Sequence, residues 1–102
     1  MKKYEVVYCD DAEAYFDDLG LYISRLTSLS FALRYLQRLR EEVETLSYLA
    51  PMLPLSKYEL PKRFHPNAKT YVIGNRKLTV VFHIDGDYVV VDKILPSALI
   101  TY

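Results

Sequence analysis

A chain of 102 residues with 51% hydrophobic and 25% charged side chains has the ordinary composition of one soluble globular domain. Its 13 basic and 13 acidic residues cancel, so the net charge favours no class of partner. A single cysteine, Cys9, excludes an internal disulfide and suits a reducing cytoplasm. No apolar run follows the first three residues, and no window could span a bilayer, so we expect one cytoplasmic domain over residues 1–102 without membrane contact.

The first two elements are predicted to be a strand and a helix. Side chains alternate over residues 3–8 as they do in a half-buried strand. Asp10 or Asp11 can cap the helix that follows, and both favour the positive end of its dipole. The apolar stripe of this helix recurs at helical spacing: Ala12, Phe16, Leu19 and Ile23. Gly20 interrupts the pattern and indicates either a close helix crossing or a weak point.

A second, longer helix is predicted to begin after Ser28 or Ser30, either of which can cap it, and to run to about Leu49. Pro51 and Pro54 stop it. Its apolar stripe consists of Ala32, Tyr35, Leu36, Leu39, Val43, Leu46 and Ala50. Because the link between the two helices is short, we expect them to form an antiparallel helical hairpin.

The next stretch, residues 57–77, carries six basic side chains against one acidic side chain, Glu59. The basic residues are Lys57, Lys62, Arg63, Lys69, Arg76 and Lys77. Such a stretch in a neutral protein is a candidate surface for a polyanion, although a solvated loop explains it equally well. His65 lies in the same stretch and can titrate near neutral pH. Pro61 and Pro66 limit regular structure here.

Three strands are predicted to complete the chain. Residues 71–73 precede a tight turn at Gly74 and Asn75, and a hairpin over residues 78–95 follows. With Asp85 and Gly86 as its two-residue loop, a type I′ turn, His83 pairs with Tyr88. One face of the hairpin then carries Val80, Phe82, Ile84, Val89 and Val91, and the other carries Val81, His83, Tyr88 and Val90. Both faces are apolar near the middle, so we expect both to be covered.

The predicted fold is therefore α+β in the order β-α-α-β-β-β, with a helical hairpin packed on one face of a four-stranded, mainly antiparallel sheet. We interpret His83 as a structural histidine on its strand. His65, His83 and Cys9 are far apart along the chain and show no metal-ligand spacing, and there is no glycine-rich phosphate loop. We expect neither a metal nor a cofactor. Asp10 and Asp11 would raise the pKa of Cys9 if their side chains lie close to it.

The order and spacing of these pieces resemble the RelE/ParE superfamily of toxins from type II toxin–antitoxin modules, the plasmid stabilisation type. The resemblance is carried by YEVVY at residues 4–8, by the helix sequence AYFDDLGLYI, by the stripe of the second helix and by the final VVFHIDGDYVVVDKI. It implies a cytoplasmic protein that a cognate antitoxin wraps and neutralises. It further implies one of two activities, cleavage of mRNA on the ribosome or inhibition of DNA gyrase, and it leaves the oligomeric state open.

The ribonuclease branch uses an arginine at the position that Thr79 holds here, and a basic or histidine position near the C-terminus falls in the neutral residues 95–97. Tyr102 matches the terminal tyrosine of that branch, a proton donor. If the chain is an enzyme, Arg76 or Lys77 would stabilise phosphate charge beside it. These differences favour a toxin that binds its target through Lys57, Lys62, Arg63, His65 and Lys69. A metal-independent ribonuclease with a non-standard site, and a non-toxic protein that only binds its partner, are the alternatives.

Overall fold

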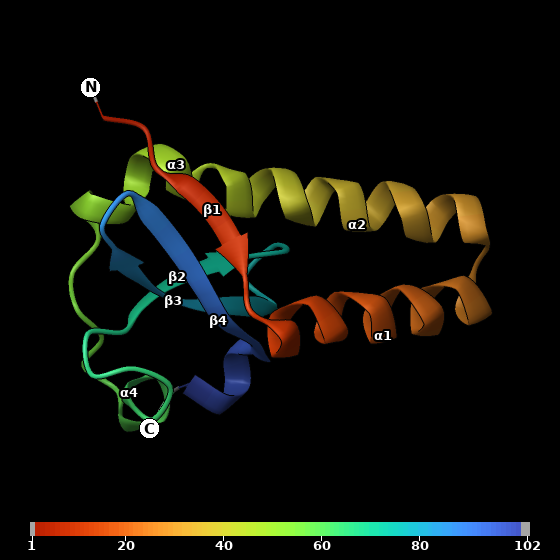
Figure 1. Cartoon of the computed structure of the whole chain (residues 1–102). Coiled ribbons are helices and arrows are strands. Elements are labelled where there is room, and N and C mark those ends of the chain that lie inside the picture. Colours follow the sequence, from red (N-terminus) through yellow and green to blue (C-terminus); the bar gives the residue numbers. More distant parts are fainter. Residues whose placement is uncertain (1, 101–102) are drawn as a thin grey trace.

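The computed structural model describes residues 2–100 and follows the predicted order of elements (Figure 1). The larger elements are β1 (Glu5–Tyr8), α1 (Asp10–Leu26), α2 (Leu29–Glu44), β2 (Lys69–Ile73), β3 (Leu78–Asp85) and β4 (Tyr88–Pro96). Four short helices complete the chain: α3 (Leu46–Leu49), η1 (Ala50–Met52), α4 (Glu59–Lys62) and η2 (Ser97–Ile100). The α4 turn contains Pro61, so the segment in which we expected prolines to limit regular structure holds one helical turn, because proline is tolerated in the first turn of a helix.

The sheet has the strand order β1-β4-β3-β2, with β1 parallel to β4 and the other neighbours antiparallel, which confirms the predicted α+β class. One sheet face packs against the inner ends of α1 and α2, and the outer ends of these helices extend beyond the sheet (Figure 1). The core between them consists of Ala12, Phe16, Leu39, Val43, Val80, Phe82, Val89, Val91 and Ile94. We call the opposite side of the sheet the second face. The helix η2 contacts β3 and α4 there.

The predicted hairpin register is wrong by one residue on each strand. Asp85 pairs with Tyr88, so the loop is Gly86 and Asp87, and His83 pairs with Val90. Of the two loop residues only Gly86 has a positive φ, of +58°, as in a type II′ turn that takes glycine first. The division of side chains between the two faces survives, because the shift moves both strands by one residue together.

A β-bulge interrupts the ladder between β3 and β4. Phe82 pairs with Val91 while Val81 pairs with Lys93, so Asp92 is the extra residue on β4. A bulge of this kind turns a side chain away from the regular alternation and increases the local twist. Asp92 lies at the site described below.

The structure corrects two predictions about the helix ends, namely the cap of the first long helix and the end of the second. Cys9, and neither Asp10 nor Asp11, is the N-cap residue of α1, and the two aspartates lie in the first turn, where the helix dipole favours them. Ser28 caps α2 by accepting a hydrogen bond from the Phe31 backbone N–H at 3.1 Å. The second helix ends at Glu44, and α3 continues the chain as a separate turn.

Gly20 marks a close crossing of the two long helices. A Cβ atom built at this position would lie 2.7 Å from Cδ1 of Leu36 on α2, closer than real Cβ contacts allow. The glycine therefore leaves room for the Leu36 side chain against α1, at the cost of weaker helix propensity. Within residues 2–100, no helix combines the length and the apolar character needed to cross a bilayer.

Candidate functional site

The basic residues predicted as a single surface fall into two groups. Lys57, Lys62 and Arg63 are exposed on the α4 segment, which we define as residues 54–68. Arg76 and Lys77 are exposed in the turn between β2 and β3. Because the α4 segment precedes β2 and the turn follows it, the two groups lie at opposite ends of this strand.

Lys69, between the two groups, has a structural role. Its Nζ donates a hydrogen bond to the Ala50 carbonyl at 2.9 Å, and its backbone forms an isolated antiparallel β-bridge with Leu55. Burial lowers the pKa of the Lys69 ammonium below its ordinary value of 10.5. The side chain is half-buried and engaged, so it is less suited to bind a partner than the exposed basic residues.

The β2–β3 turn meets a basic residue of α2 that sequence spacing did not connect with it. Lys77 and Arg38 line one hollow of about 240 Å³, together with Glu42 and Asn75. The Glu42 carboxylate accepts a hydrogen bond from the Gly74 backbone N–H at 3.2 Å and so holds the turn against α2. Arg38 also lines a neighbouring hollow with Arg34. We call this set, Arg34, Arg38, Arg76 and Lys77, the α2–turn basic surface.

The second face has a hollow of about 190 Å³ at the positions where the resemblance places ribonuclease residues. Tyr58, Thr70, Val72, Thr79, Ser97 and Ile100 line it. Thr79 is 2% exposed, and its hydroxyl lies 2.9 Å from the Ser97 hydroxyl. The lining is uncharged, so these positions offer nothing to balance a phosphate. Tyr102 lies outside the residues that the structure describes.

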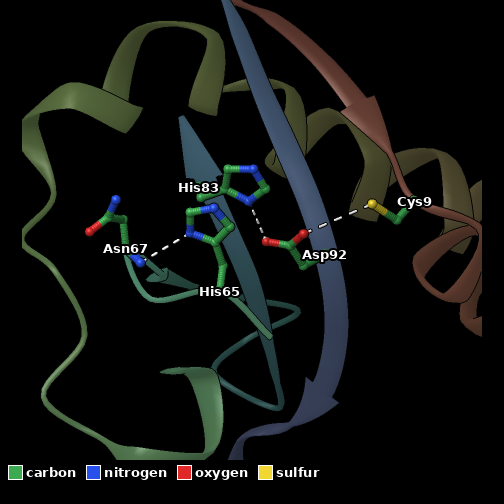
Figure 2. Close-up of polar contacts among 5 residues, drawn as sticks. All are labelled: Cys9, His65, Asn67, His83 and Asp92. Carbon is green, nitrogen blue, oxygen red and sulfur yellow. Dashed lines mark hydrogen bonds and ion pairs between the residues drawn. The ribbon is translucent and has the colours of Figure 1, made fainter. Parts of the chain in front are cut away.

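Polar side chains that lie far apart along the chain meet on the same face of the sheet (Figure 2). His83 Nδ1 lies 2.7 Å from Asp92 Oδ2, and both side chains are about nine-tenths buried, at 12% and 13% exposure. The His65 ring, from the α4 segment, stacks on the His83 ring with centroids 3.7 Å apart and planes 4° apart. His65 Nδ1 in turn accepts a hydrogen bond from the Asn67 backbone N–H at 3.0 Å. We call His65, His83 and Asp92 the histidine cluster.

The interpretation of His83 as a structural histidine on its strand did not include this cluster. His65 and His83 are far apart along the chain, and only the folding of the α4 segment over the sheet brings the rings together. The sequence linked Asp92 to His83 only weakly, because both residues lie on the same predicted hairpin. The bulge that turns its carboxylate toward the ring was not visible in the sequence.

Cys9 borders the cluster without being activated by it. The thiol lies 3.9 Å from Asp92 Oδ1. Burial, then the charges of Asp92 and Asp10, raise the pKa of the Cys9 thiol above its ordinary value of 9.0. The predicted direction is confirmed, with burial as its main cause. A thiol that keeps its proton is a poor nucleophile and a poor metal ligand. The described part of the chain brings no three His, Cys, Asp or Glu side chains together in a group that could hold a metal.

An apolar surface lies on the helical hairpin where it extends beyond the sheet. Leu21, Leu29 and Leu33 are 57%, 68% and 58% exposed. A hollow of about 350 Å³ runs between the helices there and is lined by Leu21, Leu29 and Leu33, among others. Large exposed apolar side chains that gather on one surface mark a binding site for a partner more often than single ones do. We call Leu21, Leu29 and Leu33 the hairpin leucine surface.

Neither a protein-family model nor a curated protein matches this chain. A solved chain of the chromosomal ParDE TA system from P. aeruginosa is similar over 94% of this chain and 98% of its own length, with a TM-score of 0.77 and 18% sequence identity. At that identity the similarity shows the fold alone. The chain therefore shares the fold of that chain of a ParDE TA system, in agreement with the fold that the sequence resemblance implied.

Proposed function

We propose that this chain is the toxin of a type II toxin–antitoxin module and inhibits growth by binding a macromolecular target, DNA gyrase or the ribosome, in the cytoplasm. The observation that carries this proposal is the likeness over nearly the whole length to a chain of a ParDE TA system. The uncharged hollow around Thr79 favours binding over mRNA cleavage, because phosphate chemistry needs groups that balance developing charge.

We assign contact with the target to exposed basic residues. The α2–turn basic surface joins residues from two elements around open hollows, whereas Lys57, Lys62 and Arg63 lie on the separate α4 segment. Charged surfaces of this kind steer association with an acidic partner or a nucleic acid. We assign the first contact to Arg38 and Lys77 and a secondary contact to the α4 segment.

The cognate antitoxin is proposed to cover the hairpin leucine surface with an amphipathic helical segment. The hollow there runs between two helices, and an amphipathic helix seats its apolar side chains in such a groove. The edge strand β2, where Val72 is 49% exposed, is the alternative seat, to which an extended peptide could add a strand.

A ribosome-dependent mRNA endoribonuclease is the second candidate, in which Arg76 or Lys77 balances phosphate charge and Tyr102 donates a proton. The observation that favours it is the histidine cluster, which offers proton-transfer groups on the second face. The change Tyr102→Phe separates the two candidates in part. Growth arrest that survives this change contradicts a mechanism in which Tyr102 is the proton donor.

The test of the proposed function is induced expression of the chain alone in a bacterial host, followed by primer extension on cellular mRNA and a plasmid supercoiling assay. Growth arrest with altered supercoiling and intact mRNA supports a gyrase-binding toxin. Arrest with cut mRNA supports the second candidate. Absence of arrest contradicts both toxic functions and leaves a non-toxic protein that binds its partner.

A further inference from the structure

We propose that the α2–turn basic surface binds a short acidic segment of a protein partner, with one apolar side chain of that segment seated on Phe31. This inference rests on the proposed function, in which the same surface makes the first contact with the target, and it names the chemistry that the surface recognises. It also gives Phe31 and Tyr35, which border the surface, a role in binding.

The positive charge of this surface is largely uncompensated. Over residues 2–100, none of its four cations forms an ion pair, whereas Arg40 on the same helix pairs with Glu13. The acid that lines the hollow beside Lys77 is Glu42, and its carboxylate already accepts the Gly74 backbone N–H at 3.2 Å. A carboxylate from a partner would therefore meet free donors, and a guanidinium can bind it through two parallel hydrogen bonds.

A pair of aromatic rings lies beside these cations. Phe31 and Tyr35 are one helical turn apart on α2, and their rings stack with centroids 6.5 Å apart and planes 8° apart. Phe31 is 45% exposed. With Arg34 and Arg38 the two rings line a hollow of about 140 Å³. A cavity of about 150 Å³ can hold benzene, so this hollow has room for one apolar side chain of the partner.

The aromatic and basic parts form one continuous surface. Tyr35 and Arg38 line both this hollow and the hollow at the β2–β3 turn, so the two hollows adjoin. Aromatic and arginine side chains are enriched at the centres of protein–protein interfaces, where they contribute most of the binding energy. The composition of the surface is therefore that of a site for an apolar anchor flanked by carboxylates.

The backbone of the β2–β3 turn supports a binding role. Asn75 and Arg76 have φ angles of +57° and +69°, and the turn is closed by the Lys77 N–H, which donates to the Gly74 carbonyl at 3.2 Å. A type I′ turn of this kind favours glycine at the position of Arg76. Left-handed backbone at a residue other than glycine is strained and is found preferentially at functional sites. Here the strained residue contributes a cation to the surface.

The distribution of charge favours a peptide over a nucleic acid as the partner. Beyond Arg40 the helix α2 carries the acids Glu41, Glu42 and Glu44, and the exposed cations of the α4 segment lie at the opposite end of β2. A nucleic acid presents a continuous row of phosphates and gains affinity from many cations along its path. A short acidic peptide needs only a local group of cations, which is what this surface offers.

The apolar contact is tested by fluorescence anisotropy with the purified full chain. The probe is a labelled peptide in which one phenylalanine is flanked by short runs of glutamate. We expect binding that weakens as the salt concentration rises. Phe31→Ala, or serine in place of the phenylalanine of the peptide, should weaken it by about 5–10-fold. Tyr48→Ala, at an aromatic residue that is 50% exposed on α3, is the matched control and should leave binding unchanged.

The charge contacts are tested with the same probe. Arg38→Glu combined with Lys77→Glu should weaken binding by about 100-fold or more, because it puts acids opposite the carboxylates of the peptide. Lys57→Glu combined with Lys62→Glu makes the same change of net charge on the α4 segment and should weaken binding by less than about threefold. Arg76→Gly should weaken binding while the melting temperature stays equal or rises, because glycine relieves the strained turn.

Circular dichroism melts show which variants are folded. Unchanged peptide binding in a folded Arg38 and Lys77 double variant overturns the inference. Tighter binding of single-stranded oligothymidylate than of the peptide, lost through the same changes, also overturns it and makes the surface a nucleic-acid site. If the wild-type chain arrests growth but does not bind the peptide, the inference fails while the proposed function stands. If it binds the peptide as expected but does not arrest growth, the proposed toxic function fails while the binding chemistry stands.

Discussion

Arg40 joins α2 to the start of the chain through several contacts at once. Its guanidinium carbon lies 5.2 Å from the Tyr8 ring centroid and 4.7 Å from the Phe16 ring centroid, and the guanidinium pairs with the Glu13 carboxylate. A cation over two aromatic rings gains from their negative faces, and the aliphatic part of the side chain packs against them. This residue therefore links the helical hairpin to β1.

We expect Arg40→Ala to lower the free energy of unfolding by about 1–2 kcal/mol, because it removes both ring contacts and the partner of Glu13. Urea denaturation followed by circular dichroism measures the change. Arg34→Ala, at an exposed position on the same helix, is the control and should change the stability by less than about 0.5 kcal/mol. Equal losses for the two variants would show that the ring contacts contribute nothing.

Because of Tyr8, we expect the free energy of unfolding to change with pH in the alkaline range. Burial raises the pKa of its phenol above the ordinary value of 10.0, so the folded chain keeps this proton where the unfolded chain has lost it. By linkage, the free energy of unfolding falls as the pH rises from about 10 through the raised pKa. The lowered pKa of Lys69 acts in the opposite direction below about pH 10.5.

Tyr8→Phe should therefore make stability fall less steeply with pH than it does in the wild type. Urea denaturation at a series of pH values between about 9 and 11.5 measures the slope. Tyr22→Phe, at a tyrosine that is 59% exposed, serves as the control and should leave the slope unchanged. A wild-type slope in the Tyr8 variant would contradict the burial of this phenol.

At the scale of elements, the start of α2 depends on one hydroxyl. The Ser28 side chain accepts the Phe31 N–H, whereas Ser30 lies inside the first turn, 3.4 Å from the Ser28 hydroxyl. An N-cap serine satisfies a backbone donor that no helical carbonyl can reach. The sequence allowed either serine, and the backbone geometry selects Ser28.

We expect Ser28→Ala to destabilise the protein by about 1 kcal/mol, since it removes this cap. Ser30→Ala should lower the free energy of unfolding clearly less, because it removes only a contact between two hydroxyls. Thermal melts of the two variants test the pair. A larger loss for the Ser30 variant would move the cap to that residue.

At the scale of the whole molecule, the fold separates two surfaces. The hairpin leucine surface lies on the outer helical hairpin, and the histidine cluster lies on the second face of the sheet. Since the two surfaces are built from different elements, a partner on the first need not cover the second. The α2–turn basic surface shares α2 with Leu29 and Leu33, so growth arrest has to be measured as a separate readout when the antitoxin contact is tested.

The double change Leu29→Glu and Leu33→Glu should abolish co-purification with the antitoxin, sought as the product of the adjacent gene. Growth arrest in its absence should persist, and the melting temperature should stay within a few degrees, because both side chains are largely exposed. Val72→Glu on β2 is the matched control. If that change breaks the complex and the double change does not, the antitoxin binds the edge strand.

The sequence was enough to predict the order of the larger elements, the α+β class and the residues of the helical stripes, because these depend on periodicity within single elements. It also determined which hairpin side chains share a face, since alternation fixes that whatever the register. The sequence did not determine the turn type. Asp85 and Gly86 fit one two-residue loop and Gly86 and Asp87 fit another, and the sheet as a whole selects between them.

The candidate site was decided by the tertiary structure alone. The stack of His65 on His83 and the meeting of Arg38 with Lys77 join residues that lie far apart in the chain. The contact of His83 with Asp92 depends on a bulge, which changes the direction of one side chain without changing the hydrophobic pattern. Local periodicity reports which face of an element is buried. It does not report which distant segment covers that face, and that pairing builds the site.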